Sequence, residues 1–389
     1  MNGYRISITS LCLLVAASIS VAEMNDEQQA AIDQLDATFS EAMQLEGTPA
    51  LAVALVGKQG AIWSQGYGYA DLESKRPATA DTPFMLASVS KTFIAAALMK
   101  QVEAGEMQLD QPINELLPFR IDNPWTEGET IRLIDIATHT SGIDDNYRFL
   151  DPMYKPGDPT IGMREWVQSY LVAGEKRYRK KKNYGKREPG DAYAYSNVGA
   201  AVAALAVEAT AGQPYRDYLQ QQFFAPLGME TTAFNIAEFD DDVLAVPYEE
   251  KKNRFKRLEH YGYPTYADGQ LRSSVNDLSN YLAMMLNDGV FDGERILSAE
   301  SVAQIEAEHF PNRADDGETT QALFWHRRFD GIVLAHQGGD FGVLTFIFYD
   351  LRHDLGGIVL MNSAGDGAAR MLGTALQALT DASKPFRGH

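Results

Sequence analysis

The chain has 389 residues, of which 34 are lysine or arginine and 53 are aspartate or glutamate, and its formal net charge at pH 7 is −19. A charge this negative argues against generic nucleic-acid binding, which needs a basic surface. The seven histidines are scattered without the spacing of a metal-binding motif, so we expect no metal and no other cofactor.

The first 22 residues are typical of a secretory signal peptide. Arg5 lies in a weakly basic start, a mostly apolar run follows at 11–17, and small residues at 20 and 22 form a cleavage site before Glu23. The single cysteine, Cys12, falls inside this segment, so we expect a mature chain without disulfides. No later stretch has the length of an apolar membrane span. We therefore expect a protein secreted across the inner membrane, to the periplasm or the extracellular space.

Hydrophobic periodicity and turn residues predict the elements of the mature chain. The first part of the chain is expected to form an amphipathic helix at 26–44, a hairpin of strands at 50–56 and 61–69, and a helix that begins at Ser88. A turn-rich helical stretch follows at 104–264, with an alanine-rich helix at 198–211. The last part is expected to form a helix from the capping residue Ser274 to Asn287, strands at 331–336, 343–349 and 356–361, and a final helix at 366–382. We expect the first hairpin at the edge of an antiparallel sheet.

Strands at both ends of the chain, with helices between them, predict an α/β (α+β) fold. We expect one domain over 23–389, in which 23–103 and 265–389 form a sheet lobe and 104–264 forms a helical lobe. The site is expected in the cleft between the two lobes, where pockets are common.

Ser88 and Lys91 form a Ser-x-x-Lys motif at the start of a predicted helix. Residues three apart on a helix lie on one face, so the lysine can take the proton of the serine hydroxyl and activate it as a nucleophile. The N-terminus of the helix also favours an alkoxide or an oxyanion. Because a chain of this length contains roughly one such motif by chance, the assignment needs further motifs.

Two further motifs follow, Tyr-Ser-Asn at 195–197 and His-Gln-Gly at 336–338. With the three motifs in this order, the chain resembles the penicillin-recognising serine hydrolases. Within them it is similar to the Tyr-x-Asn branch, which holds class C β-lactamases, D-alanyl-D-alanine carboxypeptidases, D-aminopeptidases and carboxylesterases. The resemblance implies a β-lactamase/transpeptidase-like fold, an antiparallel sheet flanked by helices. It continues in segments expected to be architectural, at 138–142, 226–229 and 269–274.

The resemblance also implies a role for each motif residue. Ser88 would be the acylated nucleophile, and Lys91 and Tyr195 would share the general-base and general-acid work. Asn197 would orient Lys91 and the substrate. The backbone N–H groups of Ser88 and Gly339 would hold the oxyanion, because glycine lets a strand approach the reacting carbonyl closely. A cationic lysine is expected to lower the tyrosine pKa, and a dry cleft to lower that of the lysine.

The third motif differs from that of β-lactamases and carboxypeptidases, which carry lysine where this chain has His336. Lysine offers a substrate carboxylate a permanent charge, whereas histidine, with a pKa near 6.5, offers a partial one. His336 and Gly338 are therefore expected to hold a carbonyl or another neutral group of the substrate. The leading prediction is a secreted serine hydrolase acting on an ester or amide, of the carboxylesterase or D-amino-acid peptidase type.

Two alternatives stay open. One is a β-lactamase or a penicillin-binding D-Ala-D-Ala carboxypeptidase, and the other is a binding or sensor module that keeps the fold without turnover. The expected partner is a small-molecule or cell-wall-derived ester or amide, and the sequence identifies no partner protein.

Two basic segments interrupt the acidic sequence, at 176–187 and 251–257. Such runs usually form solvated loops. Since the first one closely precedes Tyr195, it also suggests a cationic rim that attracts anionic substrates such as acidic polymers.

Overall fold

The structure, a computed structural model, describes residues 24–251, 254–310 and 319–387. The predicted signal peptide at 1–22 lies outside these residues. Within them, no helix combines the length and the apolar character that crossing a membrane requires.

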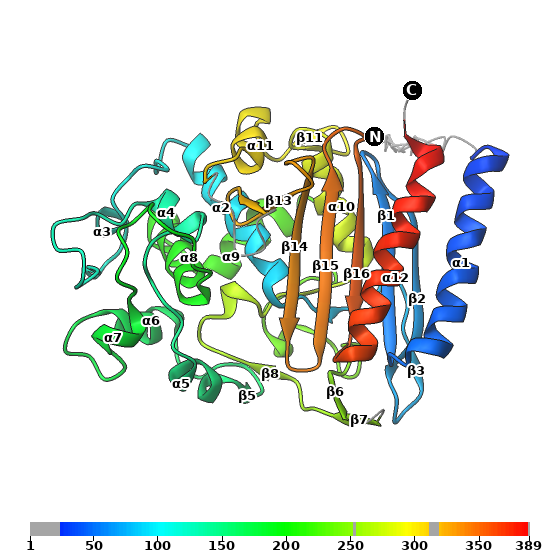
Figure 1. The fold of residues 1–389 in the computed structure, drawn as a ribbon, viewed down its shortest axis with the longest axis horizontal. Helices are drawn as coiled ribbons and strands as arrows, with labels where there is room; N and C mark the ends of the chain where they lie inside the picture. The colour runs from blue at the N-terminus through cyan, green and yellow to red at the C-terminus, as the bar shows by residue number, and fades with distance from the viewer. Residues whose placement is uncertain (1–23, 252–253, 311–318, 388–389) are drawn as a thin grey trace, which may run out of the picture.

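In the described part of the chain, an eight-stranded antiparallel sheet has the order β12-β13-β14-β15-β16-β1-β2-β3 (Figure 1). Its strands are β1 (Ala50–Gly57), β2 (Gly60–Asp71), β3 (Arg76–Pro77), β12 (Thr320–Gln321), β13 (His326–Arg328), β14 (Val333–Asp340), β15 (Val343–Asp350) and β16 (Leu355–Met361). Strands from the two ends of the chain meet where β1 pairs with β16, for example Val53 with Val359. The predicted antiparallel sheet is confirmed.

The first hairpin forms as predicted, from β1 and β2. The prediction that it lies at the edge of the sheet is wrong for β1. Because β16 pairs with the second side of β1, that strand lies inside the sheet. Every residue of β1 is buried, which explains its unbroken apolar sequence.

Twelve α-helices are described, and those predicted near both ends of the chain and after the tyrosine motif are confirmed. They are α1 (Asp26–Glu46), α2 (Lys91–Glu103), α3 (Ile113–Leu116), α4 (Leu133–Ala137), α5 (Tyr147–Leu150), α6 (Met163–Leu171), α7 (Lys180–Asn183), α8 (Asn197–Ala211), α9 (Tyr215–Leu219), α10 (Val275–Leu286), α11 (Ala299–Glu306) and α12 (Asp366–Ser383). Local signals set several boundaries: Asn25 caps α1, Gly47 ends it with a φ of 68°, and the Ser274 side chain accepts the Asp277 N–H at the start of α10.

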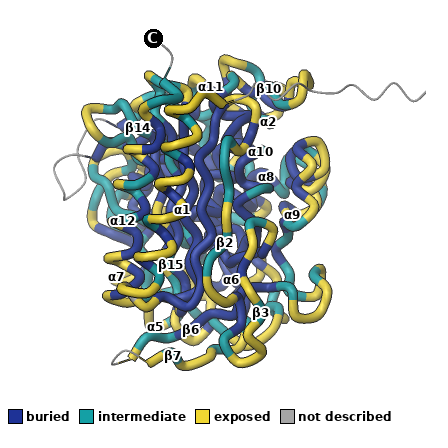
Figure 2. Tube along the Cα trace, turned by 90° about the vertical axis from the view of Figure 1, so that its right-hand side faces the viewer, coloured by how far each residue is buried: buried dark blue, intermediate teal, exposed yellow. Residues whose placement is uncertain are grey.

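The sheet separates two hydrophobic cores, because side chains of a strand alternate between its faces. Ala52 and Ala54 of β1 belong to the core shared with α2, α8 and α10, whereas Leu51, Val53 and Leu55 belong to the core under α1 and α12. Figure 2 shows buried strands behind α1, whose outward side is exposed.

Helices α3 to α9 lie together beyond α2, away from α1 and α12 (Figure 1). The short strands pair as β4 (Phe84–Met85) with β9 (Arg272–Ser273), β5 (Lys155–Pro156) with β8 (Tyr261–Gly262), β10 (Val290–Phe291) with β11 (Glu294–Arg295), and β6 (Tyr248–Lys251) with both β7 (Arg254–Arg257) and β17 (Ser363–Ala364). The β6–β7 hairpin falls within the expected helical lobe, yet it pairs with a strand near the end of the chain. The lobe boundaries stay a prediction.

Candidate active site

Ser88 lies in a 3-10 turn, η1 (Ala87–Ser90), that leads directly into α2. The turn is anchored on both sides: the Thr345 hydroxyl donates to Leu86 O over 2.6 Å, and the Ser90 hydroxyl donates to Ala87 O over 2.7 Å. Ala87 has a φ of 46°, which is unusual for a residue with a side chain. Ser88 is partly exposed between buried neighbours, so the turn presents its hydroxyl.

Gly338 allows β14 to pass this turn closely. A Cβ on Gly338 would lie 2.3 Å from Leu86 O and 2.2 Å from Thr345 Oγ1, so no other residue fits. A Cβ on Gly339 would meet no atom within 4 Å.

The edge of β14 next to Ser88 is unpaired in the described chain. Strand β13 pairs only with Val333–Ala335, so the residues of β14 after Ala335 have no strand partner on that side. A contact of the Gly339 N–H with the oxyanion stays a prediction.

Lys91 is fully buried, and its Nζ has three close neighbours. It lies 3.1 Å from Ser88 Oγ, 2.7 Å from Asn197 Oδ1 and 2.6 Å from the backbone oxygen of Asp268. The latter two oxygens can only accept. A neutral amine has two N–H donors and one lone pair, so these two bonds use both donors and leave the lone pair for the Ser88 hydroxyl.

Burial lowers the pKa of Lys91 from its usual 10.5, which favours the neutral amine, and the carboxylates of Asp268, Asp145 and Asp340 oppose this shift. For Tyr195 the expected direction is wrong. Burial raises the pKa of Tyr195, a hydrogen bond with Ser88 acts against this, and Asp268 and Asp145 raise it further. The tyrosine is therefore neutral, and the general-base role of Lys91 stays a prediction.

The Tyr195 ring is held by groups from three separate segments. The centre of the Tyr195 ring lies 4.4 Å from the centre of the His139 ring and 6.4 Å from that of His336 on β14. Lys91 Nζ lies 5.0 Å from the centre of the Tyr195 ring. His139 Nδ1 also accepts the Ser196 N–H over 3.2 Å. The segment at 138–142, expected to be architectural, thus positions the tyrosine motif.

His336 is only 2% exposed, and its ring is neutral. Burial lowers its pKa well below 6.5, and the nearby His326, 5.0 Å away between ring centres, and Lys91 lower it further. Nδ1 lies 2.9 Å from Gln337 O, which can only accept, so Nδ1 carries the proton. His336 therefore supplies no permanent positive charge.

Asp145 was missed by the sequence analysis, although it organises the second motif. Its carboxylate accepts four hydrogen bonds: from the Ser196 hydroxyl over 3.0 Å, the Asn197 N–H over 2.9 Å, the Asn197 Nδ2 over 2.9 Å and the Val198 N–H over 3.1 Å. It occupies the N-terminus of α8 as a bound anion would. With Nδ2 held by Asp145, the Oδ1 of Asn197 must face Lys91.

Asp268 is a second missed residue, and it lies at the end of the 3-10 turn η5 (Tyr266–Asp268). Its backbone oxygen accepts from Lys91, its side chain is 3% exposed, and the carboxyl Oδ2 has no hydrogen-bond partner. Burial raises the pKa of Asp268, while the Lys91 charge lowers it. The two groups therefore influence each other's protonation.

Replacing Asp268 by asparagine is expected to move the rising limb of the pH profile of kcat/KM to lower pH. The Asp268 charge stabilises the Lys91 ammonium, so its loss lowers the Lys91 pKa, and the neutral base forms at lower pH. The measurement is kcat/KM between pH 5 and pH 10, with the exposed Asp122→Asn as the control. A limb that stays in place or moves to higher pH would contradict this coupling.

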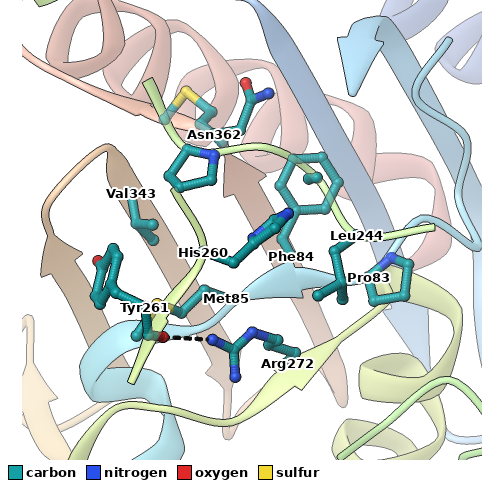
Figure 3. A pocket seen from close by; sticks show the side chains of 12 residues that line it. Pro83, Phe84, Met85, Leu244, His260, Tyr261, Arg272, Val343 and Asn362 are labelled. Carbon is teal, nitrogen blue, oxygen red and sulfur yellow. Dashed lines mark hydrogen bonds between the residues drawn. The ribbon is translucent and has the colours of Figure 1, made fainter. Parts of the chain in front are cut away.

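A small cavity is lined by residues of β4, β8 and β9, among them Phe84, Tyr261 and Arg272 (Figure 3). Its volume of about 10 Å³ accommodates at most one water molecule, so it is no substrate site. The buried Arg272 donates to Tyr261 O over 2.7 Å and to Phe234 O over 2.6 Å. These bonds fix the strand that follows Asp268.

No group of three or more histidine, cysteine, aspartate or glutamate side chains in the described ranges could hold a metal ion.

Comparisons with known proteins show the family and the fold of the chain. The sequence model of the Beta-lactamase family matches residues 35–382. Protein flp of Staphylococcus aureus (strain NCTC 8325 / PS 47) is 22% identical over 339 residues, which cover 87% of this chain and 64% of that protein. The chain thus spans less than two thirds of the length of this curated relative.

Two solved structures show the same architecture. The octameric penicillin-binding protein homologue from Pyrococcus abyssi is 26% identical, with a TM-score of 0.74 over 91% of this chain and 79% of that one. EstCE1, described as a hydrolase with promiscuous acyltransferase activity, is 20% identical, with a TM-score of 0.72 over 91% of this chain and 98% of that one. The fold is therefore β-lactamase/transpeptidase-like, as the resemblance implied.

Proposed function

The chain belongs to the Beta-lactamase family, and we propose that it is a serine hydrolase that forms an acyl-enzyme on Ser88 and cleaves esters or amides, as carboxylesterases or D-amino-acid peptidases do. The observation that carries this proposal is the environment of Lys91. Two oxygens that can only accept lie beside its Nζ, so in the neutral amine they take both N–H donors and leave the lone pair for the Ser88 hydroxyl, 3.1 Å away.

In the proposed acylation, Ser88 Oγ attacks the carbonyl carbon while its proton passes to Lys91 Nζ. The carboxylates around Lys91 stabilise the ammonium that forms. The backbone N–H groups of Ser88 and Gly339 would hold the oxyanion. Tyr195, neutral and hydrogen-bonded to Ser88, gives its proton to the leaving group and regains one from Lys91. In deacylation a water molecule replaces the leaving group, and the proton transfers run in reverse.

The charges near Ser88 favour a substrate without a carboxylate at the β14 end of the site. His336 is neutral, and Asp340, at the end of β14, is close enough to favour the charged form of Lys91. A substrate carboxylate there would meet like charge instead of a fixed cation. We therefore expect good turnover of short-chain esters or neutral amides and poor turnover of carboxylated β-lactams.

The test is a side-by-side assay of p-nitrophenyl butyrate, nitrocefin and a D-Ala-containing peptide, with Ser88→Ala as the control. Faster hydrolysis of nitrocefin than of the ester would favour the alternative of a β-lactamase. Faster cleavage of the peptide would favour a D-Ala-D-Ala carboxypeptidase. No turnover, together with no labelling by a fluorophosphonate or a fluorescent penicillin, would favour a binding or sensor module.

We also propose that the protein is secreted, on the basis of the sequence at 1–22 alone. The expected mature N-terminus is Glu23. Mass spectrometry of the protein recovered from the periplasm or the medium checks this, and recovery of the uncleaved chain from the cytoplasm would contradict it.

The basic segment at 176–187 is proposed to attract anionic polymers, such as cell-wall material, to the enzyme. Its lysines are exposed, and no ion pair is described for Lys180, Lys181 or Lys182. Lys180 and Lys186 instead lie 4.4 and 4.6 Å from the centre of the Trp125 ring. The segment adjoins the site, because Asp144, next to Asp145, donates its N–H to Asn183 O over 2.9 Å.

Reversing three charges, by replacing Lys180, Lys181 and Lys182 with glutamate, is expected to raise KM for a polyanionic ester substrate several-fold at low salt, with little effect at high salt. The control makes the same change at Lys251, Arg254 and Lys256. Steady-state kinetics across salt concentrations measures both, and equal salt dependence in the two variants would dispose of the idea.

A further inference from the structure

A second, larger cavity lies on the outer face of the sheet, and Ser88 does not line it. Its volume is about 820 Å³, and it lies between α12 and the strands β14, β15 and β16. In Figure 1, α12 lies in front of β16 and β1, while β14 and β15 lie beside it with no helix in front of them. We call this cavity the outer groove.

The floor and one wall of the outer groove are apolar. Ala335 pairs with Phe348 and Gln337 with Phe346, so these side chains share the outer face. Helix α12 supplies Leu372, Leu376 and Leu379. From Val333 to Gln337 the floor extends over roughly 13 Å, given the usual rise of a strand. A Cβ on Gly373 of α12, which is exposed and lines the groove, would meet no atom within 4 Å.

The charged groups of the outer groove gather at one end. Arg328 precedes β14, Arg352 follows β15 and Arg387 follows α12, and the ends of these elements meet at the same edge of the sheet. Arg352 is paired with Asp350 over 3.0 Å. The Nε atoms of Arg328 and Arg387 are buried without a hydrogen-bond partner. Arg387 also donates from Nη2 to the Ser383 hydroxyl over 3.1 Å.

We propose that the outer groove binds a fatty acid, with the carboxylate at Arg328 and Arg387 and the chain along Ala335 and Phe348 beneath α12. The planar guanidinium groups of Arg328 and Arg387, which line the groove, match the two oxygens of a carboxylate through their terminal N–H donors. A head group with several negative charges would be repelled by Asp330 and Asp350, which line the same end. The net charge of −19 opposes unspecific attraction of an anion.

The test is a calorimetric titration of the whole mature protein with dodecanoate, kept below its micelle concentration. One molecule is expected to bind per chain. Dodecyltrimethylammonium and dodecanol, with the same chain and other head groups, are expected to bind at least about tenfold more weakly. Arg328→Gln and Arg387→Gln should each raise Kd about tenfold. The control Arg120→Gln, whose side chain is 74% exposed, should leave it unchanged.

Filling the groove with Leu376→Trp should abolish binding of dodecanoate. If that variant does not fold, Gly373→Leu narrows the groove at a position where the added Cβ displaces nothing. Ser88→Ala should bind dodecanoate as the unmodified protein does, so this result stands apart from the hydrolase proposal. Equal binding of the three head groups, or loss of binding in Ser88→Ala, would overturn the inference. The inference would also be overturned if sedimentation data showed that two copies of the chain associate through this face and that dodecanoate does not compete with this association.

Discussion

Replacing Lys91 by methionine is expected to lower kcat/KM by a factor of about 10² to 10⁴, the usual contribution of a positioned general base. Methionine keeps most of the side-chain volume in this buried position, but its thioether sulfur is not basic enough to accept the Ser88 proton. The removed amine no longer has to be desolvated, so folding should survive the change. Stopped-flow or steady-state hydrolysis of p-nitrophenyl butyrate measures the loss, and thermal unfolding checks the fold.

The matched control is Lys100→Met on the same helix, whose amine donates to Glu103 and to Ile296 O outside the site. It should change kcat/KM by less than about twofold. Comparable losses in the two variants, or near-normal turnover in Lys91→Met, would remove Lys91 from the mechanism and make Tyr195 the candidate base.

Replacing Asp145 by alanine is expected to lower the free energy of unfolding by about 3 kcal/mol and to reduce turnover. The change removes the acceptor of four hydrogen bonds at the start of α8. Asn197, which loses its bond to Asp145, is then free to turn its amide away from Lys91. Denaturant unfolding gives the stability, and a burst-phase measurement gives the acylation rate.

Asp122→Ala is the control for this prediction. Asp122 pairs with Arg120 at the surface, with about half of its side chain exposed, so its loss should cost less than about 0.5 kcal/mol. Asp145→Asn keeps one acceptor oxygen and should fall between the two. An unfolding free energy of Asp145→Ala within about 0.5 kcal/mol of the unmodified protein would show that the four bonds contribute little.

Features that depend on neighbours in sequence were predictable. Ser88 and Lys91 approach each other because residues three positions apart lie on one face of a helical turn. Ser274 caps α10 by accepting the N–H of the residue three positions later. The sequence near each pair contains the whole signal.

Features that depend on distant segments were harder to predict. Tyr195 and Asn197 were found only through the motif resemblance, since more than a hundred residues separate them from Ser88. The interior position of β1 depends on its pairing with β16, for which the hairpin itself gives no signal. The direction of the Tyr195 pKa also depends on burial, and the whole fold determines that burial.

The missed residues have the same explanation. Asp145 is one of two adjacent aspartates in a loop, and its partners lie 51 to 53 positions later. Asp268 contacts Lys91 through a backbone oxygen, which any residue could supply. No local pattern distinguishes either one from an ordinary surface carboxylate.

The most direct test of the central claim is intact-mass and peptide mass spectrometry of the mature protein after reaction with a fluorophosphonate, and after acid quenching during turnover of p-nitrophenyl butyrate. We predict one adduct per chain, located on Ser88 and absent from Ser88→Ala. Ser90→Ala provides the matched control, because Ser90 lies in the same turn but is buried with its hydroxyl bonded to Ala87 O. An adduct on another residue, or ester turnover that survives in Ser88→Ala, would contradict the account.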